Sequence, residues 1–375
     1  MIFYLGVIKL QNIMKIKLDN LDTENFMSHE HILNGEVVTL IQPKNIGAKW
    51  KKDNLHFRSS VWNYNGELIS ASFPKFFNWG EQPDLSPVPT SLKNATVVEK
   101  LDGSTLIVSK YNGQYILRTR GTVDASTLAN GHELEIFKNT ILSKLADNND
   151  TWDYSVLFEW LSPINKIVLN YGDEPSWRLI GFINHINYSL AQQDMLDAMA
   201  KKYGFDRPAT YTFSSVQDLL KDVDQWRGKE GVVVYSKNDQ MLHKVKAMQY
   251  LKCHAFKSNA TFENTIEMFF EFDMPSYQDF EVKLIEKFDY ECYQMVRGHI
   301  STICDGYKEI LNIVEGMHRF VDKIKLLNTR KEQATAVFSS YGKESNRSSY
   351  IFTILDGKKL SKEQLKKLLY QVTKK

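Results

Sequence analysis

Asn-Gly pairs between strand-like runs constrain this chain more than any other local feature. Asn65-Gly66 and Asn112-Gly113 each lie between two runs rich in β-branched and aromatic residues. The four flanking runs are residues 59–63, 67–73, 105–111 and 114–118. Asn-Gly is a strong hairpin signal, because both central residues of a type I′ turn need a positive φ. The sequence therefore predicts antiparallel strand pairs at both places.

The rest of the first two thirds of the chain mixes further strand-like runs with helical ones. The strand-like runs are residues 97–100, 154–161, 177–186, 231–235 and 241–245. Helical periodicity covers about residues 128–145, 190–203 and 215–226. Such irregular alternation, combined with hairpins, is typical of an α+β fold and not of a doubly wound parallel sheet. We therefore expect antiparallel sheets flanked by helices.

From about residue 255 the pattern becomes helical. Apolar residues recur at steps of four and three over residues 296–324, which predicts one long helix or two stacked helices with a buried stripe. Three glycines in this stretch could interrupt the helix: Gly298, Gly306 and Gly316. The later strand-like run 350–355 is short. We predict two domains: residues 1–254, including an N-terminal subdomain, and a mainly helical domain of residues 255–375.

The charge balance shows where nucleic acid could bind. The 375 residues carry 47 Lys and Arg against 45 Asp and Glu, so the net charge is only +2. Residues 261–315 hold twelve acids and four bases (net −8), whereas residues 316–375 hold fourteen bases and five acids (net +9). Binding to nucleic acid must therefore come from local clusters of basic residues. The basic C-terminal stretch is either a solvated surface or an RNA contact.

Cysteine content and hydropathy indicate a cytoplasmic protein. The three cysteines are an odd number without metal-ligand spacing, which favours reduced thiols. No run approaches the roughly 18 apolar residues that a membrane-spanning helix needs. The apolar N-terminal stretch, residues 1–8, is short and has no basic leader, so we do not expect a signal peptide. Either Met1 or Met14 could be the functional start.

The run 97–100 ends in Lys100, followed by Leu101-Asp102-Gly103. A lysine there could act as a nucleophile. A pKa of about 10.4 leaves only a few parts in ten thousand as free amine at neutral pH, a handicap of about 4–5 kcal/mol. Nearby cations reduce this handicap because they disfavour the ammonium form. An isolated Lys-x-Asp-Gly is more simply a surface lysine before a turn, so the interpretation depends on the rest of the chain.

Further charged motifs follow Lys100 in order. They are Arg118-Thr119-Arg120, Phe158-Glu159, Glu230-Gly231 and Lys244-Val245-Lys246. Arg118 and Arg120 are two residues apart on a predicted strand, so we expect them to share a face and to bind phosphate. Lys244 and Lys246 have the same spacing, so we expect their ammonium groups on the same side of a strand. Glu159 lies within an apolar strand, where a charge is rarely buried without a partner. Taken singly, each motif would be a salt-bridged or solvent-facing group; their order and spacing favour a common site.

In this order the motifs resemble those of covalent nucleotidyltransferases, which include ATP-dependent DNA and RNA ligases and mRNA capping enzymes. Upstream, Arg58 and residues 73–81, which include Lys-Phe-Phe-Asn, are similar to the RNA ligase 1 family. The founding member of that family is the tRNA-repair ligase of T-even phages. Residues 165–171 resemble the same family, and the resemblance extends from about Arg58 to Lys257. One departure is Ser59, where the family usually has glycine.

The resemblance implies three phosphoryl transfers. Lys100 attacks the α-phosphate of ATP, forming lysyl-AMP and releasing pyrophosphate. The AMP then passes to the 5′-phosphate of an RNA end, and a 3′-hydroxyl attacks that phosphate, seals the strand and expels AMP. Most of the catalysis in such steps is positioning and electrostatic stabilisation.

The resemblance also implies roles for individual residues. The implied catalytic residues are Lys100, Glu159, Glu230, Lys244 and Lys246. The implied nucleotide-binding residues are Arg58, Lys75, Phe77, Glu99, Lys100, Gly103, Arg120, Glu159, Glu230, Gly231, Lys244 and Lys246. The implied ligands for Mg²⁺ or Mn²⁺ are Asp102, Glu159 and Glu230. Phe77 would support the site by packing, and Gly103 and Gly231 would let the backbone approach the nucleotide.

The implied partner is RNA with 5′-phosphate and 3′-hydroxyl ends, such as nicked tRNA, bound by a monomer in the cytoplasm, which would be the host's if the gene is a phage gene. The helical domain would confer RNA preference. A DNA ligase or a capping guanylyltransferase is the alternative enzyme. Those enzymes usually carry a five-stranded oligonucleotide-binding barrel after the last motif, and the sequence there is helical. An inactive RNA-binding homologue is a further alternative, but the lysines that it should have lost are present.

Overall fold

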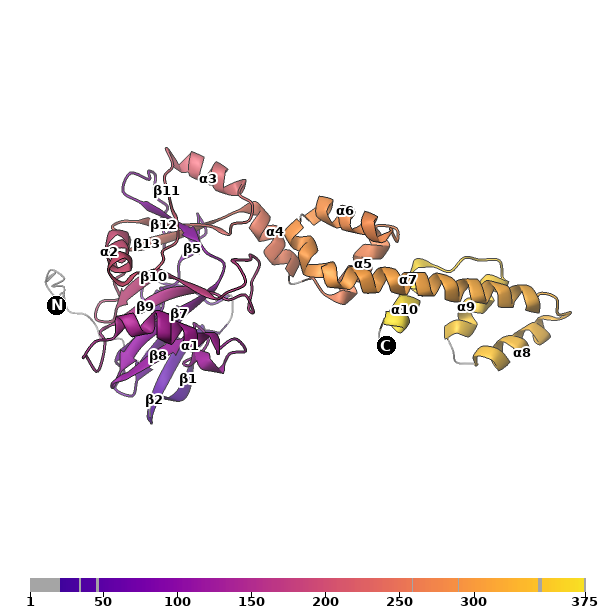
Figure 1. Cartoon of the computed structure of the whole chain (residues 1–375), viewed down its shortest axis with the longest axis horizontal. Coiled ribbons are helices and arrows are strands. Elements are labelled where there is room, and N and C mark those ends of the chain that lie inside the picture. The colour runs from indigo at the N-terminus through magenta and orange to yellow at the C-terminus, as the bar shows by residue number, and fades with distance from the viewer. Residues whose placement is uncertain are drawn as a thin grey trace. The chain divides into compact units, whose positions relative to one another are not determined.

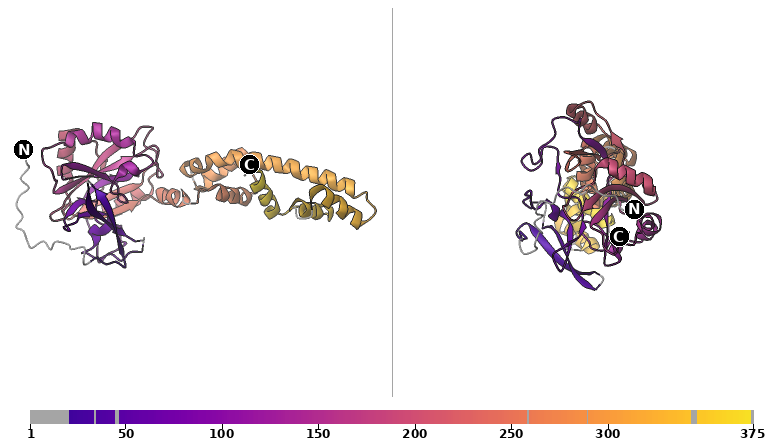
Figure 2. Two further views of the ribbon diagram at one scale, coloured as in Figure 1. Left: turned by 90° about the horizontal axis from the view of Figure 1, so that it is seen from below. Right: turned by 90° about the vertical axis from the view of Figure 1, so that its left-hand side faces the viewer.

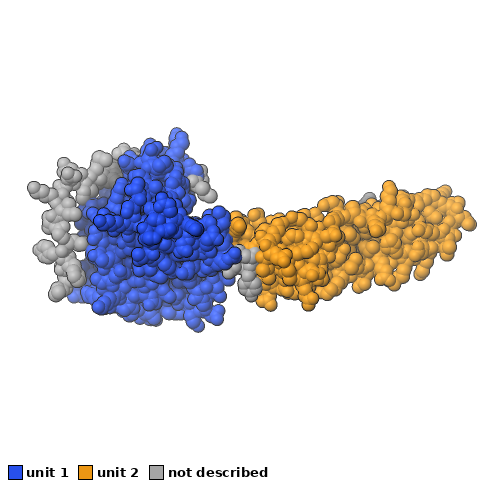
Figure 3. Space-filling view, turned by 90° about the horizontal axis from the view of Figure 1, so that it is seen from above, with its two compact units in different colours: residues 1–251 blue, residues 252–375 orange. Residues whose placement is uncertain are grey.

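The computed structural model describes residues 21–33, 35–44, 47–257, 259–288, 290–342 and 346–373. The predictions about a signal peptide in residues 1–8 and about Met1 or Met14 as the start lie outside these residues. The chain divides into two compact units, Met1–Leu251 and Lys252–Lys375 (Figure 3). The described part of unit 1 contains three sheets, and the described elements of unit 2 are all helices (Figure 1). The predicted α+β class is therefore confirmed.

The first sheet is an antiparallel meander in the order β1-β2-β3-β4. Its strands are β1 (Phe26–Leu33), β2 (Glu36–Pro43), β3 (Ser60–Asn63) and β4 (Leu68–Ala71). The predicted β3–β4 hairpin is confirmed, but only Gly66 of its Asn-Gly pair has a positive φ. The amide of Gly66 donates to the carbonyl of Asn63, and the amide of Asn63 donates to that of Glu67. The connection is thus a three-residue loop with a left-handed glycine and not the type I′ turn we expected.

The second sheet has the strand order β10-β9-β7-β8. Its strands are β7 (Ser104–Tyr111), β8 (Gln114–Arg118), β9 (Tyr154–Leu161) and β10 (Ser176–Asn184). In the β7–β8 hairpin Asn112 and Gly113 have φ values of 48° and 77°, as a type I′ turn requires. One face of the sheet packs on α1 (Glu133–Thr140) and α2 (Gln193–Tyr203) around a core that contains Phe158 and Trp160.

The third sheet has the order β11-β6-β12-β13-β5. Its strands are β5 (Phe77–Asn78), β6 (Thr96–Lys100), β11 (Thr210–Tyr211), β12 (Gly231–Ser236) and β13 (Met241–Lys246). Helix α3 (Val216–Asp224) covers one face through Val97, Val232 and Val245. On the other face, Val98 and Val233 pack against the second sheet. Because side chains alternate along a strand, the residues of β6, β12 and β13 fall into two sets, and one set faces the second sheet.

Unit 2 is built around one long helix. Helix α4 (Met248–Lys257) begins in unit 1, and unit 2 continues with α5 (Phe262–Glu271), α6 (Tyr277–Phe288), α7 (Tyr290–Ile324), α8 (Arg330–Tyr341), α9 (Asn346–Leu355) and α10 (Lys362–Thr373). The predicted apolar stripe lies on α7, and most of its members are buried. None of the three glycines interrupts this helix. At Gly306 a Cβ would lie 2.7 Å from the Thr373 side chain, so glycine lets α10 pack closely on α7 (Figure 2).

The predicted strand at residues 350–355 is wrong, because this segment belongs to helix α9. The run has high strand propensity, but Tyr350, Ile351, Ile354 and Leu355 form one buried helical face, and α9 packs on α7. Tertiary packing therefore overrides the local propensity. In the described part of unit 2 no strand occurs, so an oligonucleotide-binding barrel has no counterpart there. No helix in the described ranges is both long and apolar enough to cross a membrane.

Candidate active site

The register of the third sheet places three lysines on one face. Gly231 pairs with Lys100 on one side and with Lys246 on the other, and Lys244 pairs with Val233. Since Val233 faces the second sheet, the side chains that share its parity face the same way. The side chains of Lys100, Lys244 and Lys246 therefore extend from the face of the third sheet that packs on the second sheet. The sequence prediction that the two lysines of β13 share a side is consistent with this register.

Glu230 joins two of these lysines. Its Oε2 lies 2.8 Å from Lys100 Nζ, and its Oε1 lies 2.9 Å from Lys246 Nζ. The Glu230 side chain is buried, and its backbone carbonyl accepts a hydrogen bond from the amide of Ala247. Hydrogen bonds between ionised groups are among the strongest in proteins. One carboxylate thus fixes the positions of both amino groups.

Gly231 and Gly103 allow strands to approach each other closely. A Cβ on Gly231 would lie 2.1 Å from the carbonyl oxygen of Val245, and its φ of 146° is one that other residues rarely adopt. A Cβ on Gly103 would lie 2.6 Å from the carbonyl oxygen of Trp160. The sequence suggested that these glycines make room for nucleotide. In the structure the atoms that exclude a side chain at both positions belong to neighbouring strands.

Glu159 reaches the same space from the second sheet. It has the parity of Leu157, which packs against the third sheet. Its Oε1 accepts a hydrogen bond of 3.0 Å from the amide of Gly103. Burial raises the pKa of Glu159 to about 7, although the charge of Lys100 opposes this change. A second carboxyl group therefore lies beside the turn that follows Lys100 at the end of β6.

Two further cations, Arg58 and Lys75, lie near Lys244. The ring of Phe76 lies between two of them: its centroid is 4.9 Å from Cζ of Arg58 and 5.1 Å from Nζ of Lys244. Lys75 Nζ lies 5.2 Å from the ring of Phe77, which is buried on β5 beside β13. Burial and the surrounding cations lower the pKa of Lys244 to about 7. Burial also lowers the pKa of Arg58 and of Lys75.

This cation cluster is suited to an anion. Within the described ranges no ion pair includes Arg58, Lys75 or Lys244. Positive charges that repel one another in a partly desolvated space gain most when a polyanion enters. Phe76 was not predicted as part of the site. Its position inside the Lys-Phe-Phe-Asn sequence could have indicated that it belongs to the site.

The expectation that Arg118 and Arg120 share a face is wrong. Strand β8 ends at Arg118, so strand alternation does not continue to Arg120. Arg118 is fully buried and donates hydrogen bonds to oxygens of Ser59 and Ser70, whereas Arg120 is exposed. Arg120 is near enough to Arg58 for its charge to help lower the pKa of that residue. Only one of the two arginines is therefore accessible to a ligand.

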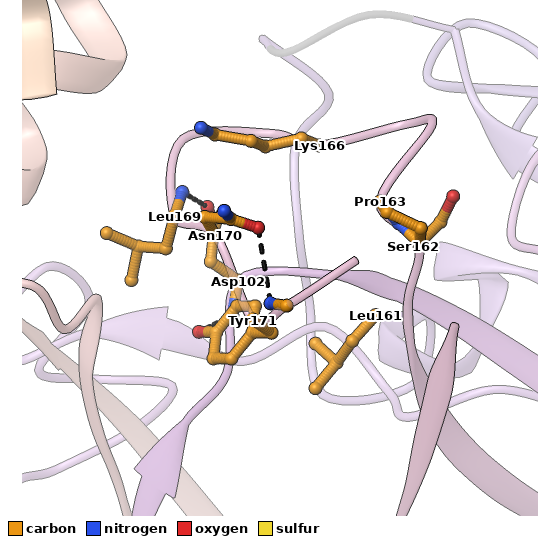
Figure 4. A pocket seen from close by; sticks show the side chains of 9 residues that line it. Asp102, Leu161, Ser162, Pro163, Lys166, Leu169, Asn170 and Tyr171 are labelled. Atoms are coloured by element: carbon orange, nitrogen blue, oxygen red, sulfur yellow. Dashed lines mark hydrogen bonds between the residues drawn. The ribbon is translucent and has the colours of Figure 1, made fainter. Parts of the chain in front are cut away.

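Asp102 is held by hydrogen bonds inside the protein. Its Oδ2 accepts from the amides of Val168 and Leu169 at 2.7 and 2.8 Å, and its Oδ1 accepts from the Tyr250 hydroxyl at 2.7 Å. The amide of Asp102 donates to the Tyr171 hydroxyl, 2.9 Å away. Figure 4 shows Asp102 and Tyr171 together at a small cavity that Lys166 also lines. The sequence did not predict either tyrosine as part of the site, although Tyr171 ends the family-like stretch 165–171.

Glu99 lies on the opposite face from Lys100. It pairs with Val232 and belongs to the side that α3 covers. Its Oε2 accepts a hydrogen bond of 3.1 Å from the Tyr211 hydroxyl, and Lys229 donates to the same hydroxyl. The side chain of Glu99 thus points away from the three lysines, and only its backbone lies near them.

The sequence matches a family model described as RNA ligase over residues 55–274, more than half of the chain. This chain belongs to the RNA ligase family. The resemblance to the RNA ligase 1 family is therefore confirmed. The match begins at the 3₁₀ turn Leu55–Arg58, which carries Arg58, and it includes every residue of the candidate site.

Two viral proteins are similar in sequence. A protein of Autographa californica nuclear polyhedrosis virus, described as a bifunctional polynucleotide kinase/RNA ligase, is 31% identical over 214 residues. That match covers 52% of this chain but only 30% of the viral protein. An RNA ligase of Rhodothermus phage RM378 is 25% identical over 314 residues, covering 65% of this chain and 70% of the phage protein.

Solved structures of ligases are similar at low sequence identity. An archaeal ATP-dependent RNA ligase is 14% identical, with a TM-score of 0.46 over 74% of this chain and 76% of that one. A mutant of a Naegleria gruberi RNA ligase, solved with ATP and Mn, is 13% identical, with a TM-score of 0.41 over 61% of this chain and 76% of that one.

Proposed function

We propose that this chain is an ATP-dependent RNA ligase that carries AMP on Lys100 and joins 5′-phosphate to 3′-hydroxyl ends. One observation supports the proposal most. A lysine at the end of a strand lies with two other lysines on one sheet face, close to Arg58 and Lys75, which form no ion pair within the described ranges. Such a face can bind a triphosphate and place its α-phosphorus next to an amine.

In the first step, Nζ of Lys100 would attack the α-phosphorus and pyrophosphate would leave. Lys100, whose side chain is partly exposed, must first release a proton to solvent and leave its ion pair with Glu230. Lys246 remains at the other oxygen of this carboxylate and would compensate its charge. Lys244, whose pKa is about 7, would bind a non-bridging oxygen of the phosphate. Arg58, with Lys75 and Arg120, would hold the β- and γ-phosphates or the RNA end.

The site fits a hydrated divalent cation, Mg²⁺ or Mn²⁺. Mg²⁺ keeps several waters and needs only one or two carboxylates. Glu159 and Glu230 are both buried here, and the Oε2 of Glu159 has no hydrogen-bond partner in the described part of the chain. We propose that these two residues hold the ion, which would neutralise phosphate charge, and that Glu159 also contacts the ribose. Two backbone amides and the Tyr250 hydroxyl hold both carboxylate oxygens of Asp102, whereas Oε2 of Glu230 becomes available when Lys100 leaves its ion pair. We therefore propose a structural role for Asp102 in place of the metal binding that the resemblance implies.

The RNA would be engaged by both units. We propose that unit 2, whose residues 316–375 carry a net charge of +9, supports substrate preference. Phosphate contacts of this kind supply affinity that falls with salt. A nicked tRNA is the substrate that we propose for a monomer acting in the cytoplasm. Competition between nicked tRNA and an unstructured strand in a sealing assay tests this part separately.

Incubation with α-labelled ATP and magnesium tests the central claim. The wild-type protein should gain one AMP, and mass spectrometry of its peptides should locate the AMP on Lys100. Lys100→Ala should show no labelled protein, whereas the control Lys93→Ala, at an exposed lysine, should be labelled like wild type. GTP in place of ATP should give no label, which separates ligation from capping. A labelled Lys100→Ala protein, or an adduct on another side chain, would refute the proposal.

A further inference from the structure

Arg118 is buried without a carboxylate. Its exposed fraction is 0%, and in the described ranges it forms no ion pair. Five hydrogen bonds, all to uncharged oxygens, satisfy the guanidinium. The acceptors are Ser59 Oγ (2.7 Å), Ser70 Oγ (2.7 Å) and the backbone oxygens of Ser59 (3.3 Å), Ser70 (3.1 Å) and Thr119 (3.1 Å). A charged group is almost never fully buried unless an opposite charge pairs with it. Arg118 is an exception, and hydrogen bonds to uncharged oxygens take the place of an ion pair.

These hydrogen bonds belong to a buried network between the first and second sheets. The Ser109 hydroxyl donates to Ser70 Oγ at 2.8 Å, and it contacts Ser155 Oγ, also at 2.8 Å. Ser155 Oγ in turn lies 2.8 Å from Nε2 of His185. Hydrogen bonds are stronger in a buried region of low dielectric constant, so this network helps to fix the geometry of the segments that it joins.

Ser59 extends this network to the phosphate-binding arginines. Its hydroxyl accepts from Nη1 of Arg118 and donates to the carbonyl oxygen of Arg120, 2.9 Å away. Ser59 directly follows Arg58 and has an extended backbone with a φ of −173°. One hydroxyl thus connects the residue next to Arg58 with the backbone of Arg120. Glycine, the usual residue of the family at this position, could form neither side-chain hydrogen bond.

We propose that Ser59, anchored by Arg118, is a positioning residue that sets the distance between Arg58 and Arg120. The two side chains carry like charges and repel each other, so their separation depends on how firmly the backbone holds them. The inference rests on the proposed function, in which both guanidinium groups bind phosphate. Loss of the Ser59 hydroxyl should therefore weaken the binding of phosphate-bearing ligands more than it affects the fold.

Ser59→Ala can be compared with Ser70→Ala. Both serines are fully buried, and each substitution removes one hydroxyl acceptor from Arg118. Only the Ser59 hydroxyl also donates to the carbonyl oxygen of Arg120. The readouts are the melting temperature and the Kd for two probes, inorganic tripolyphosphate and a 5′-phosphorylated oligoribonucleotide, measured by calorimetry. We expect Ser59→Ala to weaken at least one probe about fivefold, the effect of roughly one hydrogen bond. Ser70→Ala should lower the melting temperature by a similar amount and leave both Kd values unchanged.

Equal Kd values for the two variants would overturn the inference, whether both are unchanged or both are weakened. The readout does not require turnover, so it separates this inference from the proposed function. A wild-type protein that forms no AMP adduct contradicts the proposed function. A wild-type protein that forms the adduct, together with variants that bind the probes alike, contradicts only the role of Ser59.

Discussion

Replacing Lys244 with methionine should stabilise the folded protein near neutral pH, although the proposed function requires this lysine. Lys244 lies on β13 among other cations, and burial followed by the charges of Arg58 and Lys75 lowers its pKa from an ordinary 10.5 to about 7. Below pH 7 the lysine is protonated in both the folded and the unfolded protein, so the full unfavourable term acts on the folded state. Methionine keeps the length and apolar character of the side chain without the charge.

The size of the effect follows from the pKa. Each pKa unit corresponds to about 1.4 kcal/mol, so the protonated form is disfavoured by at most about 5 kcal/mol. Water reaches part of the side chain and screens the repulsion, so we expect a gain of about 1–2 kcal/mol at about pH 6.5. As the pH rises, the folded protein loses the proton first and its stability increases. At about pH 9.5 the unfavourable term has fallen to about a third of its value at about pH 6.5.

Tryptophan fluorescence during urea unfolding measures this effect in unit 1 alone, because all seven tryptophans lie between residues 50 and 226. The gain in unfolding free energy for Lys244→Met should shrink between about pH 6.5 and about pH 9.5. Lys93→Met, which makes the same change in net charge at an exposed position, should show no such gain. A loss of stability for Lys244→Met that is the same at both pH values would refute the reasoning.

Three further predictions concern the groups around Lys100. Glu230→Ala removes both ion pairs and should give a folded protein, by circular dichroism, that seals no RNA; retained strand joining would place the essential carboxylate elsewhere. Lys246→Arg should transfer AMP to the protein more slowly than wild type, because a planar guanidinium does not replace an ammonium. A wild-type rate would contradict this prediction. Tyr250→Phe leaves Asp102 Oδ1 with one hydrogen bond fewer and should lower the unfolding free energy by about 1–2 kcal/mol in urea. An unchanged midpoint for Tyr250→Phe would show that this hydrogen bond contributes nothing.

Local patterns in the sequence predicted most elements of unit 1. The run 154–161 coincides with β9, and the two hairpins pair as expected. Strands β1 and β2 were missed, although Asn34-Gly35 between them repeats the same signal and Gly35 has a φ of 82°. The order of strands within the sheets could not be predicted, because it depends on pairs between residues far apart in the chain, such as Gly231 with Lys100. The α9 segment was misassigned since its helical face is defined only by packing on α7.

The candidate site was predictable as a set of motifs but not as a set of contacts. The spacing of Lys244 and Lys246 gave their common face, because alternation along a strand is a local property. Burial of Arg118 depends on where β8 ends and on serines of the first sheet. The hydrogen bond from Tyr250 to Asp102 spans 148 positions, and no periodicity encodes a contact of that kind.

The turn that joins β12 to β13 sets the register of β13, and therefore the face on which Lys244 and Lys246 lie. Lys237, Asn238 and Asp239 all have positive φ values there, so the turn allows little freedom in how the two strands meet. Slippage by one residue would reverse the orientation of every side chain on β13. Lys244 and Lys246 would then be directed at α3, and Val245 would face the second sheet in their place. Deleting Asn238 from this turn should therefore abolish the proposed AMP transfer, although every charged residue of the candidate site is retained.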